Sequence, residues 1–210
     1  MKTLDPKHIP ILEEKYGPYW WPVKCPEEVS TDPFKNLIIT VLSQNTREIN
    51  CVRAYNGLTA RFEVKPEVFA RAKTEEIKEA IRSGGLYNVK SQRIKELSQT
   101  VLEKFGGDIS CVLALPKEEA RKKLMELPGI GKKTADVLLG QKHSYAEVTV
   151  VDTHMERIAK RVDLVKPEAK YEETQKALKG FIPWERGRKN RGLVVASGKV
   201  HLQSSEPQMS

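Results

Sequence analysis

The sequence predicts an all-α protein, and three observations lead to that prediction. Apolar residues recur at the spacing of one helix face through most of the chain. Prolines and glycines stand where such helices would begin and end, and the connections between them are short. Only residues 147–151 have the β-branched composition of a strand, and that segment is brief. No internal repeat or low-complexity segment indicates another architecture.

The first predicted helix follows an N-terminal stretch, residues 1–30, whose prolines make us expect mostly irregular structure. This helix begins at Asp32-Pro33, because proline is tolerated in the first helical turn. Its buried face consists of Phe34, Leu37, Ile38, Val41 and Leu42. The next helix, ended by Gly106-Gly107, has an apolar face made of Val89, Ile94, Leu97, Val101 and Phe105. Further helices are predicted over 118–127, 132–139, 153–162 and 171–181, with a last one beginning near Asn190.

Length and charge limit the classes of protein to consider. A chain of 210 residues can hold one large or two small domains with their own cores. A formal charge of +8 favours a polyanionic partner, because lysine and arginine release the counterions of phosphates on binding. The alternative is a soluble protein with a high charge content of 30%. No apolar run approaches the roughly 20 residues of a membrane helix, and no secretory signal opens the chain. We therefore expect a cytoplasmic protein that has no membrane partner.

The cysteines and histidines give no sign of a metal site. Cys25, Cys51 and Cys111 are far apart, and their odd number argues against a disulfide framework. No pair has the spacing of a zinc-finger or iron–sulfur motif, so small buried apolar residues are the simpler interpretation. His154 likewise has no set of metal ligands around it in the sequence.

A glycine-rich segment separates two of the predicted helices. Residues 127–139 read LPGIGKKTADVLL, in which Pro128 ends the first helix and the glycines allow positive φ and close backbone approach. We expect the amides from Gly129 to Lys132 to face outward at a helix N-terminus, which is a site for an anion. Such a hairpin grips the phosphate backbone and reads no bases. The alternative is an ordinary connection between two helices.

An amine and a carboxylate accompany this hairpin. Lys132 and Lys133 are one helical step apart, so their side chains point in different directions. One can meet phosphate while the other acts as a nucleophile, although two phosphate-binding lysines are the simpler alternative. The sequence VDTH at 151–154 adds a carboxylate at the start of a further helix. A capping box would make Thr153 the N-cap and leave Asp152 outside the helix; alternatively, Asp152 is the cap. A phosphate site, an amine and a carboxylate together indicate lesion chemistry on DNA.

These segments resemble the helix–hairpin–helix DNA glycosylase superfamily, in its endonuclease III branch. The motifs that carry the resemblance are segment 127–139, VDTH at 151–154, DPF at 32–34, LSQNT at 42–46 and GLYN at 85–88. The resemblance implies a six-helix barrel domain over residues 33–145 and a second helical domain formed by residues 1–32 and 146–210. The active site would lie in the cleft between these domains and hold an extruded base.

The resemblance also implies catalytic roles for two residues. Lys133 would be the Schiff-base nucleophile at the sugar C1′, and Asp152 would be the catalytic carboxylate. A lysine at this position favours a bifunctional enzyme, which removes the base and then cleaves the strand by β-elimination, since the adenine-mismatch branch typically lacks it. The leading hypothesis is therefore a base-excision-repair DNA glycosylase and abasic-site lyase acting on oxidised pyrimidines. The alternatives are a monofunctional thymine or uracil mismatch glycosylase and a non-catalytic helix–hairpin–helix DNA-binding protein.

Other matching positions would contact the DNA. The extruded base leaves a gap, and either Gln44 or Asn45 would enter it. Leu86 would wedge the opposite strand as an apolar side chain, unless it is a core leucine. The backbone would be bound by Gly129, Gly131 and Lys132. The implied partner is double-stranded DNA that contains damaged or mismatched bases, bound by a nucleoid-associated monomer.

The chain departs from the endonuclease III pattern near its C-terminal end. Enzymes of that branch usually carry a four-cysteine iron–sulfur loop, but Leu202 and Met209 stand about where its first two cysteines would be. No cysteine follows Cys111, so we expect no iron–sulfur cluster and no other cofactor. Either this lineage lacks the cluster or the tail has been altered or truncated. The resemblance allows a monovalent cation at the hairpin carbonyls.

Two further segments leave alternatives open. A basic group near the C-terminal end is either a phosphate-facing patch or a solvated face, and it comprises Arg186, Arg188, Lys189 and Arg191. The sequence YWWP at 19–22 resembles an N-terminal motif of the mismatch-glycosylase branches, or else covers the core of the second domain. If one of these aromatic residues lines the base pocket, the substrates would include mispaired thymine or uracil.

Overall fold

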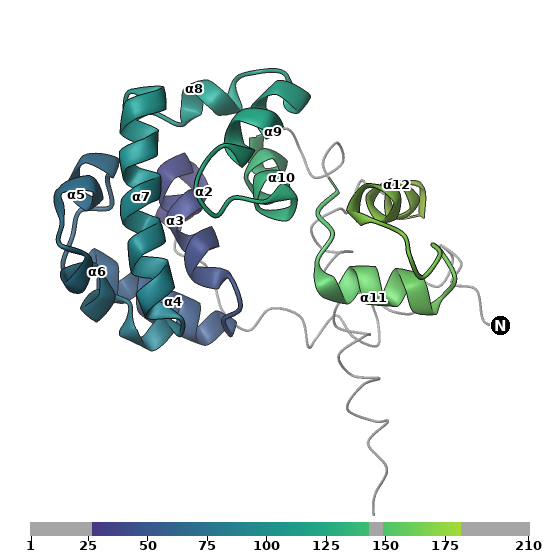
Figure 1. Ribbon diagram of the computed structural model, residues 1–210, viewed down its shortest axis with the longest axis horizontal. Coiled ribbons are helices and arrows are strands. Elements are labelled where there is room, and N and C mark those ends of the chain that lie inside the picture. Colours follow the sequence, from purple (N-terminus) through teal and green to yellow (C-terminus); the bar gives the residue numbers. More distant parts are fainter. Residues whose placement is uncertain (1–26, 143–148, 182–210) are drawn as a thin grey trace, which may run out of the picture. The chain divides into compact units, whose positions relative to one another are not determined.

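The computed structural model describes residues 27–142 and 149–181, and these residues form helices joined by short loops (Figure 1). The predicted all-α class is therefore confirmed. The chain divides into two compact units. The large unit is Val23–Lys142, and the small unit contains the described residues 149–181. The domain limits implied by the family resemblance remain a prediction.

The large unit is arranged around one long helix, α7 (Figure 1). Its elements in chain order are α2 (Glu27–Thr31), α3 (Pro33–Ser43), α4 (Glu48–Thr59), α5 (Pro66–Arg71), α6 (Thr74–Ala80), the 3-10 turn η3 (Arg82–Gly84), α7 (Tyr87–Phe105), α8 (Ser110–Leu113), α9 (Lys117–Met125) and α10 (Lys132–Lys142). Helix α7 packs against α5, α6 and α3. Helix α3 in turn packs against α4 and α10, so that it lies in the core of the unit.

Helix α3 forms where the sequence predicts it. The side chain of Asp32 caps it by accepting hydrogen bonds from the amides of Phe34 (2.8 Å) and Lys35 (3.1 Å). The predicted apolar face is buried, and Leu37 and Ile38 are fully so. A helix that buries a whole face in this way gains most of its stability from packing and little from intrinsic propensity.

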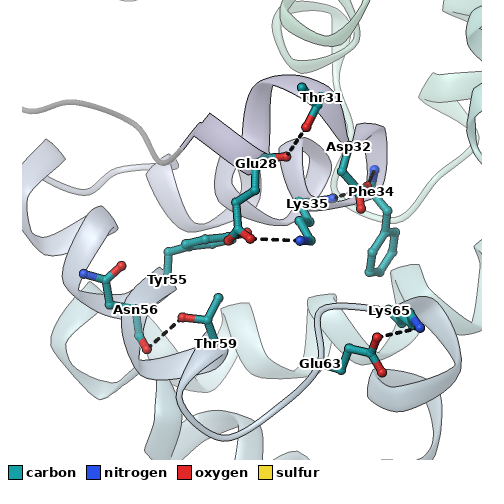
Figure 2. A network of polar contacts seen from close by, with 10 residues as sticks. All are labelled: Glu28, Thr31, Asp32, Phe34, Lys35, Tyr55, Asn56, Thr59, Glu63 and Lys65. Carbon is teal, nitrogen blue, oxygen red and sulfur yellow. Dashed lines mark hydrogen bonds and ion pairs between the residues drawn. The ribbon is translucent and has the colours of Figure 1, made fainter.

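A polar network near the start of α3 connects it to α2 and α4 (Figure 2). Glu28 of α2 accepts hydrogen bonds from the Lys35 ammonium (2.9 Å) and from the Tyr55 hydroxyl (3.0 Å). The hydrogen bond from Lys35, followed by that from Tyr55, lowers the pKa of the Glu28 carboxyl from its ordinary value of 4.5. Tyr55 is 1% exposed, so this network ties a surface carboxylate to a core side chain.

The two helices that flank the glycine-rich hairpin are held together by a buried ion pair. Arg121 of α9 donates two hydrogen bonds to Asp136 of α10, Nε to Oδ1 at 2.9 Å and Nη2 to Oδ2 at 3.1 Å. Asp136 is 1% exposed. A bidentate pair has one favoured geometry, so it fixes how α9 and α10 pack.

The small unit is a pair of packed helices, α11 (Thr153–Arg161) and α12 (Tyr171–Phe181). Val151, Met155 and Leu178 form its buried cluster. The segment before α11 is held on α12 by two hydrogen bonds. The amide of Val151 donates to the Tyr171 hydroxyl (3.4 Å), and Nε2 of Gln175 donates to the Thr149 carbonyl (2.6 Å).

Several details differ from the sequence-based expectations. A strand was expected over 147–151; its described part, residues 149–151, is not a strand, because its polar backbone atoms bond to side chains of α12. Residues Glu27–Thr31 are helical, where irregular structure was expected, since Val29 is buried and α2 packs on α3. Cys51 is buried as expected, but Cys111 is exposed. None of the helices in residues 27–142 and 149–181 combines the length and the apolar character that a membrane span needs. The helix expected near Asn190 lies outside the described residues.

Candidate functional site

The hairpin between α9 and α10 has the turn that its glycines predict. Gly129 has a φ of 74°, a conformation that residues other than glycine rarely adopt. A Cβ at Gly131 would meet no atom of the described residues within 4 Å, so only an approaching ligand would require a glycine there. One of the four amides expected to face outward does not, because Ile130 is buried and its amide donates to the Leu127 carbonyl (3.1 Å).

Both hairpin lysines are at the start of α10. Lys132 is the first residue of the helix, Lys133 is the second, and both are exposed. The two following residues, Thr134 and Ala135, are buried, which holds the helix start against the large unit. The two amines therefore lie on the first turn of α10, next to the glycine turn, and the buried Thr134 and Ala135 hold this turn in place.

The turn that follows α3 holds Gln44 and Asn45. Asn45 is exposed and has a φ of 50°, a left-handed conformation that asparagine tolerates better than most residues. Gln44 is half-buried, and its Nε2 donates to the carbonyl of Gly129 (3.2 Å). The turn and the hairpin, 85 residues apart in sequence, are therefore in contact.

Leu86 precedes α7 and faces solvent. Its side chain is 54% exposed, so the alternative that it is a core leucine is wrong. Its φ of 49° is unusual for a bulky residue, and such backbone conformations are held in place by surrounding structure. Val89, three positions further along the same helix face, is also 55% exposed. Leu86 and Val89 therefore form an exposed apolar pair at the start of α7.

A lysine that the sequence analysis overlooked joins the turn after α3 to the loop before α7. Lys90 is 2% exposed, and its ammonium donates to the Leu42 carbonyl (2.7 Å), the Gly84 carbonyl (3.1 Å) and the Thr46 hydroxyl. The Thr46 hydroxyl in turn donates to the Gly84 carbonyl (2.7 Å). Burial lowers the pKa of the Lys90 ammonium, although three acceptors surround it. A sequence signal existed, because Lys90 lies four residues before Ile94 on the apolar face of the helix.

A second residue of α7 joins the same turn to the hairpin. Arg93 donates from Nη1 to Oε1 of Gln44 (2.6 Å). Its side chain also passes over Gly129, where an added Cβ would stand 2.2 Å from Nε of Arg93. Gln44 thus contacts Arg93 through its oxygen and Gly129 through its nitrogen. The sequence analysis overlooked Arg93, because nothing in the helical periodicity marks it.

Asp152 belongs to the small unit, where it caps α11. Its Oδ1 accepts a hydrogen bond from the amide of Met155 (2.8 Å), and the helix begins at Thr153. Asp152 is therefore the N-cap, so of the two alternatives the one with Thr153 as N-cap is wrong. The reason is the buried cluster, because packing of Val151 and Met155 against α12 fixes the register of the chain at this helix start.

The residues present do not fit a four-thiolate cluster, because the whole chain contains three cysteines. Cys51 is buried beside the Ile39 carbonyl, and Cys111 is exposed on α8. Across residues 27–142 and 149–181, no group of three or more His, Cys, Asp or Glu side chains could hold a metal ion. A cation at the hairpin stays a prediction; the Gly129 carbonyl accepts from Gln44. The basic group at 186–191 and the aromatic residues at 19–22 lie outside the described residues.

The all-helical fold and the glycine hairpin followed by lysines define the class of helix–hairpin–helix DNA-repair proteins. The chain belongs to the HhH-GPD superfamily of base excision DNA repair proteins, whose sequence profile matches residues 38–183. It is a base-excision-repair DNA glycosylase. This confirms the predicted family.

Individual relatives support the same branch. The chain is 37% identical to endonuclease III of Thermotoga maritima over 179 residues, which are 84% of this chain and 78% of the relative. It is 28% identical to endonuclease III of Bacillus subtilis, over 97% of this chain and 88% of the relative. Among solved structures, a trapped endonuclease III–DNA covalent intermediate is similar with a TM-score of 0.75 and 25% identity, covering 98% of this chain and 92% of that chain.

Proposed function

We propose that this glycosylase is bifunctional: it removes oxidised pyrimidines from double-stranded DNA and then cleaves the strand at the abasic site. The observation that carries the proposal is the position of Lys133, an exposed amine in the first turn of α10 directly after the hairpin. The similar endonuclease III complex is a trapped covalent intermediate with DNA, and a nucleophilic amine is a group that can form such a bond. The enzyme would act as a monomer in the cytoplasm, on DNA of the nucleoid.

The chemistry follows from the amine. The Lys133 nitrogen, as the free amine, bonds to the sugar C1′ while the bond from C1′ to the base breaks, and the base leaves with the electron pair. Loss of a proton from nitrogen and opening of the sugar ring give a Schiff base. Removal of a C2′ proton then expels the 3′ phosphate by β-elimination, and water releases the lysine. Asp152 would stabilise the cationic sugar or accept a proton in these steps.

The residues that bind DNA would belong to the large unit. Amides at Gly129 and Gly131, with the charge of Lys132, would hold the backbone phosphate, for which the open space at Gly131 leaves room. The exposed Leu86 would wedge the opposite strand, and the turn at Gln44 and Asn45 would fill the gap of the extruded base.

Borohydride trapping tests this proposal. Duplexes with thymine glycol, dihydrouracil, 8-oxoguanine, T:G, U:G or an abasic site are incubated with the protein, with and without borohydride. We expect a covalent adduct on oxidised pyrimidines and abasic sites that Lys133→Ala abolishes. Lys122→Ala, which removes an exposed lysine of α9, is the matched control and should trap like wild type. Asp152→Asn should slow base release by about 100-fold or more while the protein still binds DNA.

The other outcomes are equally clear. Base release without trapping on any duplex would make the protein a monofunctional glycosylase, and release from T:G or U:G alone would identify a mismatch enzyme. Binding without base release would leave a non-catalytic DNA-binding protein. An adduct that survives Lys133→Ala would assign the nucleophile to another residue.

A further inference from the structure

Two basic side chains of α7 make contacts that the catalytic steps do not use. Lys90 and Arg93 are three positions apart, so they lie on one face of the helix. One joins the turn after α3 to the loop before α7, and the other joins that turn to the hairpin. The three segments that would contact DNA are therefore connected to a single helix within the large unit.

We propose that Lys90 and Arg93 are positioning residues that hold these three segments in their DNA-binding arrangement before DNA arrives. We call the contacts of Lys90 and Arg93 with these three segments the brace. Gln44 is part of the brace, and Asn45 is the residue that enters the duplex. The proposal deepens the proposed function on which it rests, since it names which residue of the turn fills the gap and what holds it there.

The contacts of Lys90 are complete. An ammonium has three N–H donors, and the carbonyls of Leu42 and Gly84 and the hydroxyl of Thr46 accept all three. A buried charge is costly unless it is hydrogen-bonded in this way. Burial of the Lys90 ammonium is therefore favourable only while the turn after α3 and the loop before α7 keep their positions. The contacts of Lys90 thus couple the end of α3 to the residues that immediately precede Leu86.

The orientation of the Gln44 amide is also determined. Arginine only donates, so the oxygen of the amide must face Arg93. A carbonyl only accepts, so the NH2 group must face Gly129. Both ends of the amide are thus used inside the protein. Arg93 also occupies the space that a side chain at Gly129 would need. The absence of a side chain at Gly129 therefore lets the Arg93 guanidinium lie close to the hairpin turn.

Asn45 is in the opposite situation. It is exposed at the tip of the turn, with a left-handed backbone that projects it from the surface. A side chain that must enter a DNA stack gains from a turn already fixed in place, because the ordering cost is met during folding and not during binding. The brace through Gln44 would supply that order.

The brace is tested first in the free protein. Amide hydrogen exchange is measured for residues 43–46 and 129–131 in wild type, Arg93→Met, Arg93→Lys, Gln44→Ala and Asn45→Ala. We expect about ten-fold faster exchange of both segments in Arg93→Met and Gln44→Ala, no further increase in their double variant, and partial recovery in Arg93→Lys. Asn45→Ala and the control Arg71→Met, an exposed arginine of α5, should leave the hairpin unchanged. Wild-type exchange in Arg93→Met and Gln44→Ala would overturn the brace.

Insertion is tested with DNA. A duplex carries a stable abasic analogue with 2-aminopurine beside it, whose fluorescence rises when the base is unstacked. We expect Asn45→Ala to lose most of the fluorescence change although its hairpin exchange is normal, and Arg93→Met to need about ten-fold more protein for the same change. Full insertion by Asn45→Ala would overturn the assignment. A wild-type protein inactive on every lesion would end the proposed function but would leave the exchange result intact, so the two failures are distinguishable.

Discussion

The two ends of α3 are held by different kinds of contact. At its N-terminal end, Asp32 caps the helix through amides two and three residues away, and Lys35 pairs with Glu28 seven residues away (Figure 2). At its C-terminal end, the Leu42 carbonyl is bound by Lys90, 48 residues away, and Gln44 binds Gly129, 85 residues away. The N-terminal end is therefore held mainly by residues near it in the sequence, with Tyr55 of α4 as a more distant partner of Glu28, whereas the C-terminal end is held by contacts that exist only in the assembled unit.

The contacts at the N-terminal end of α3 serve stability, whereas those at its C-terminal end serve the proposed function. The local contacts at the N-terminal end persist whenever α2 and α3 form, and they add modest stability. The distant contacts at the C-terminal end exist only in the packed unit, and they determine where Gln44 and Asn45 stand relative to Leu86 and the hairpin. We expect mutations at the two ends to differ in size and in kind.

Lys90→Met should have the largest effect. It removes all three donors and leaves the buried carbonyls of Leu42 and Gly84 without the ammonium, at a cost of about 3 kcal/mol in the free energy of unfolding. Lys35→Met, at the other end of α3, removes a partly exposed ion pair and should cost less than about 1 kcal/mol. Urea unfolding of both variants measures the contrast. Equal costs would mean that the two ends are held alike.

Asp32→Ala should have an intermediate effect. It removes the acceptor for two amides at the start of α3 and should cost about 1 kcal/mol in the free energy of unfolding. Because the loss is local, hydrogen exchange in the turn at 43–46 should keep its wild-type rate relative to global unfolding. Specific loosening of that turn would show that the two ends of α3 are coupled.

Glu28→Gln should have the smallest effect, and it should depend on pH. The lowered pKa of Glu28 means that the ionised form stabilises the fold above the ordinary value of 4.5 and that this contribution disappears as the pH falls through the lowered value. Since Glu28 is exposed, the contribution should not exceed about 0.5 kcal/mol. Wild type should be the more stable protein at pH 7, and the difference from the variant should shrink as the pH falls below 4.5. A difference that is independent of pH would contradict the proposed cause.

The sequence-based expectations were right where contacts are local and wrong or missing where contacts are long-range. The start of α3 was predicted from Asp32-Pro33, and the end of α7 from Gly106, which has a φ of 61° as a helix C-cap. The strand expected over 147–151 does not form in its described part, residues 149–151, which bonds to α12. Of the two caps considered for α11, the structure has Asp152 and not Thr153. Helices α4, α5, α6 and α8 were not identified; α5 and α6 pack on α7, and that burial depends on the tertiary structure.

The all-α class, the hairpin followed by two lysines and the family to which the chain belongs follow from the sequence alone. These features rest on local chemistry: helical periodicity, proline and glycine at helix ends, and a short motif whose residue types suffice to define it. The exposure of Leu86, the hydrogen bond from Gln44 to Gly129 and the burial of Lys90 become visible only in the packed fold. Contacts between residues 48 and 85 positions apart depend on how the helices pack, and no local pattern encodes which residues meet.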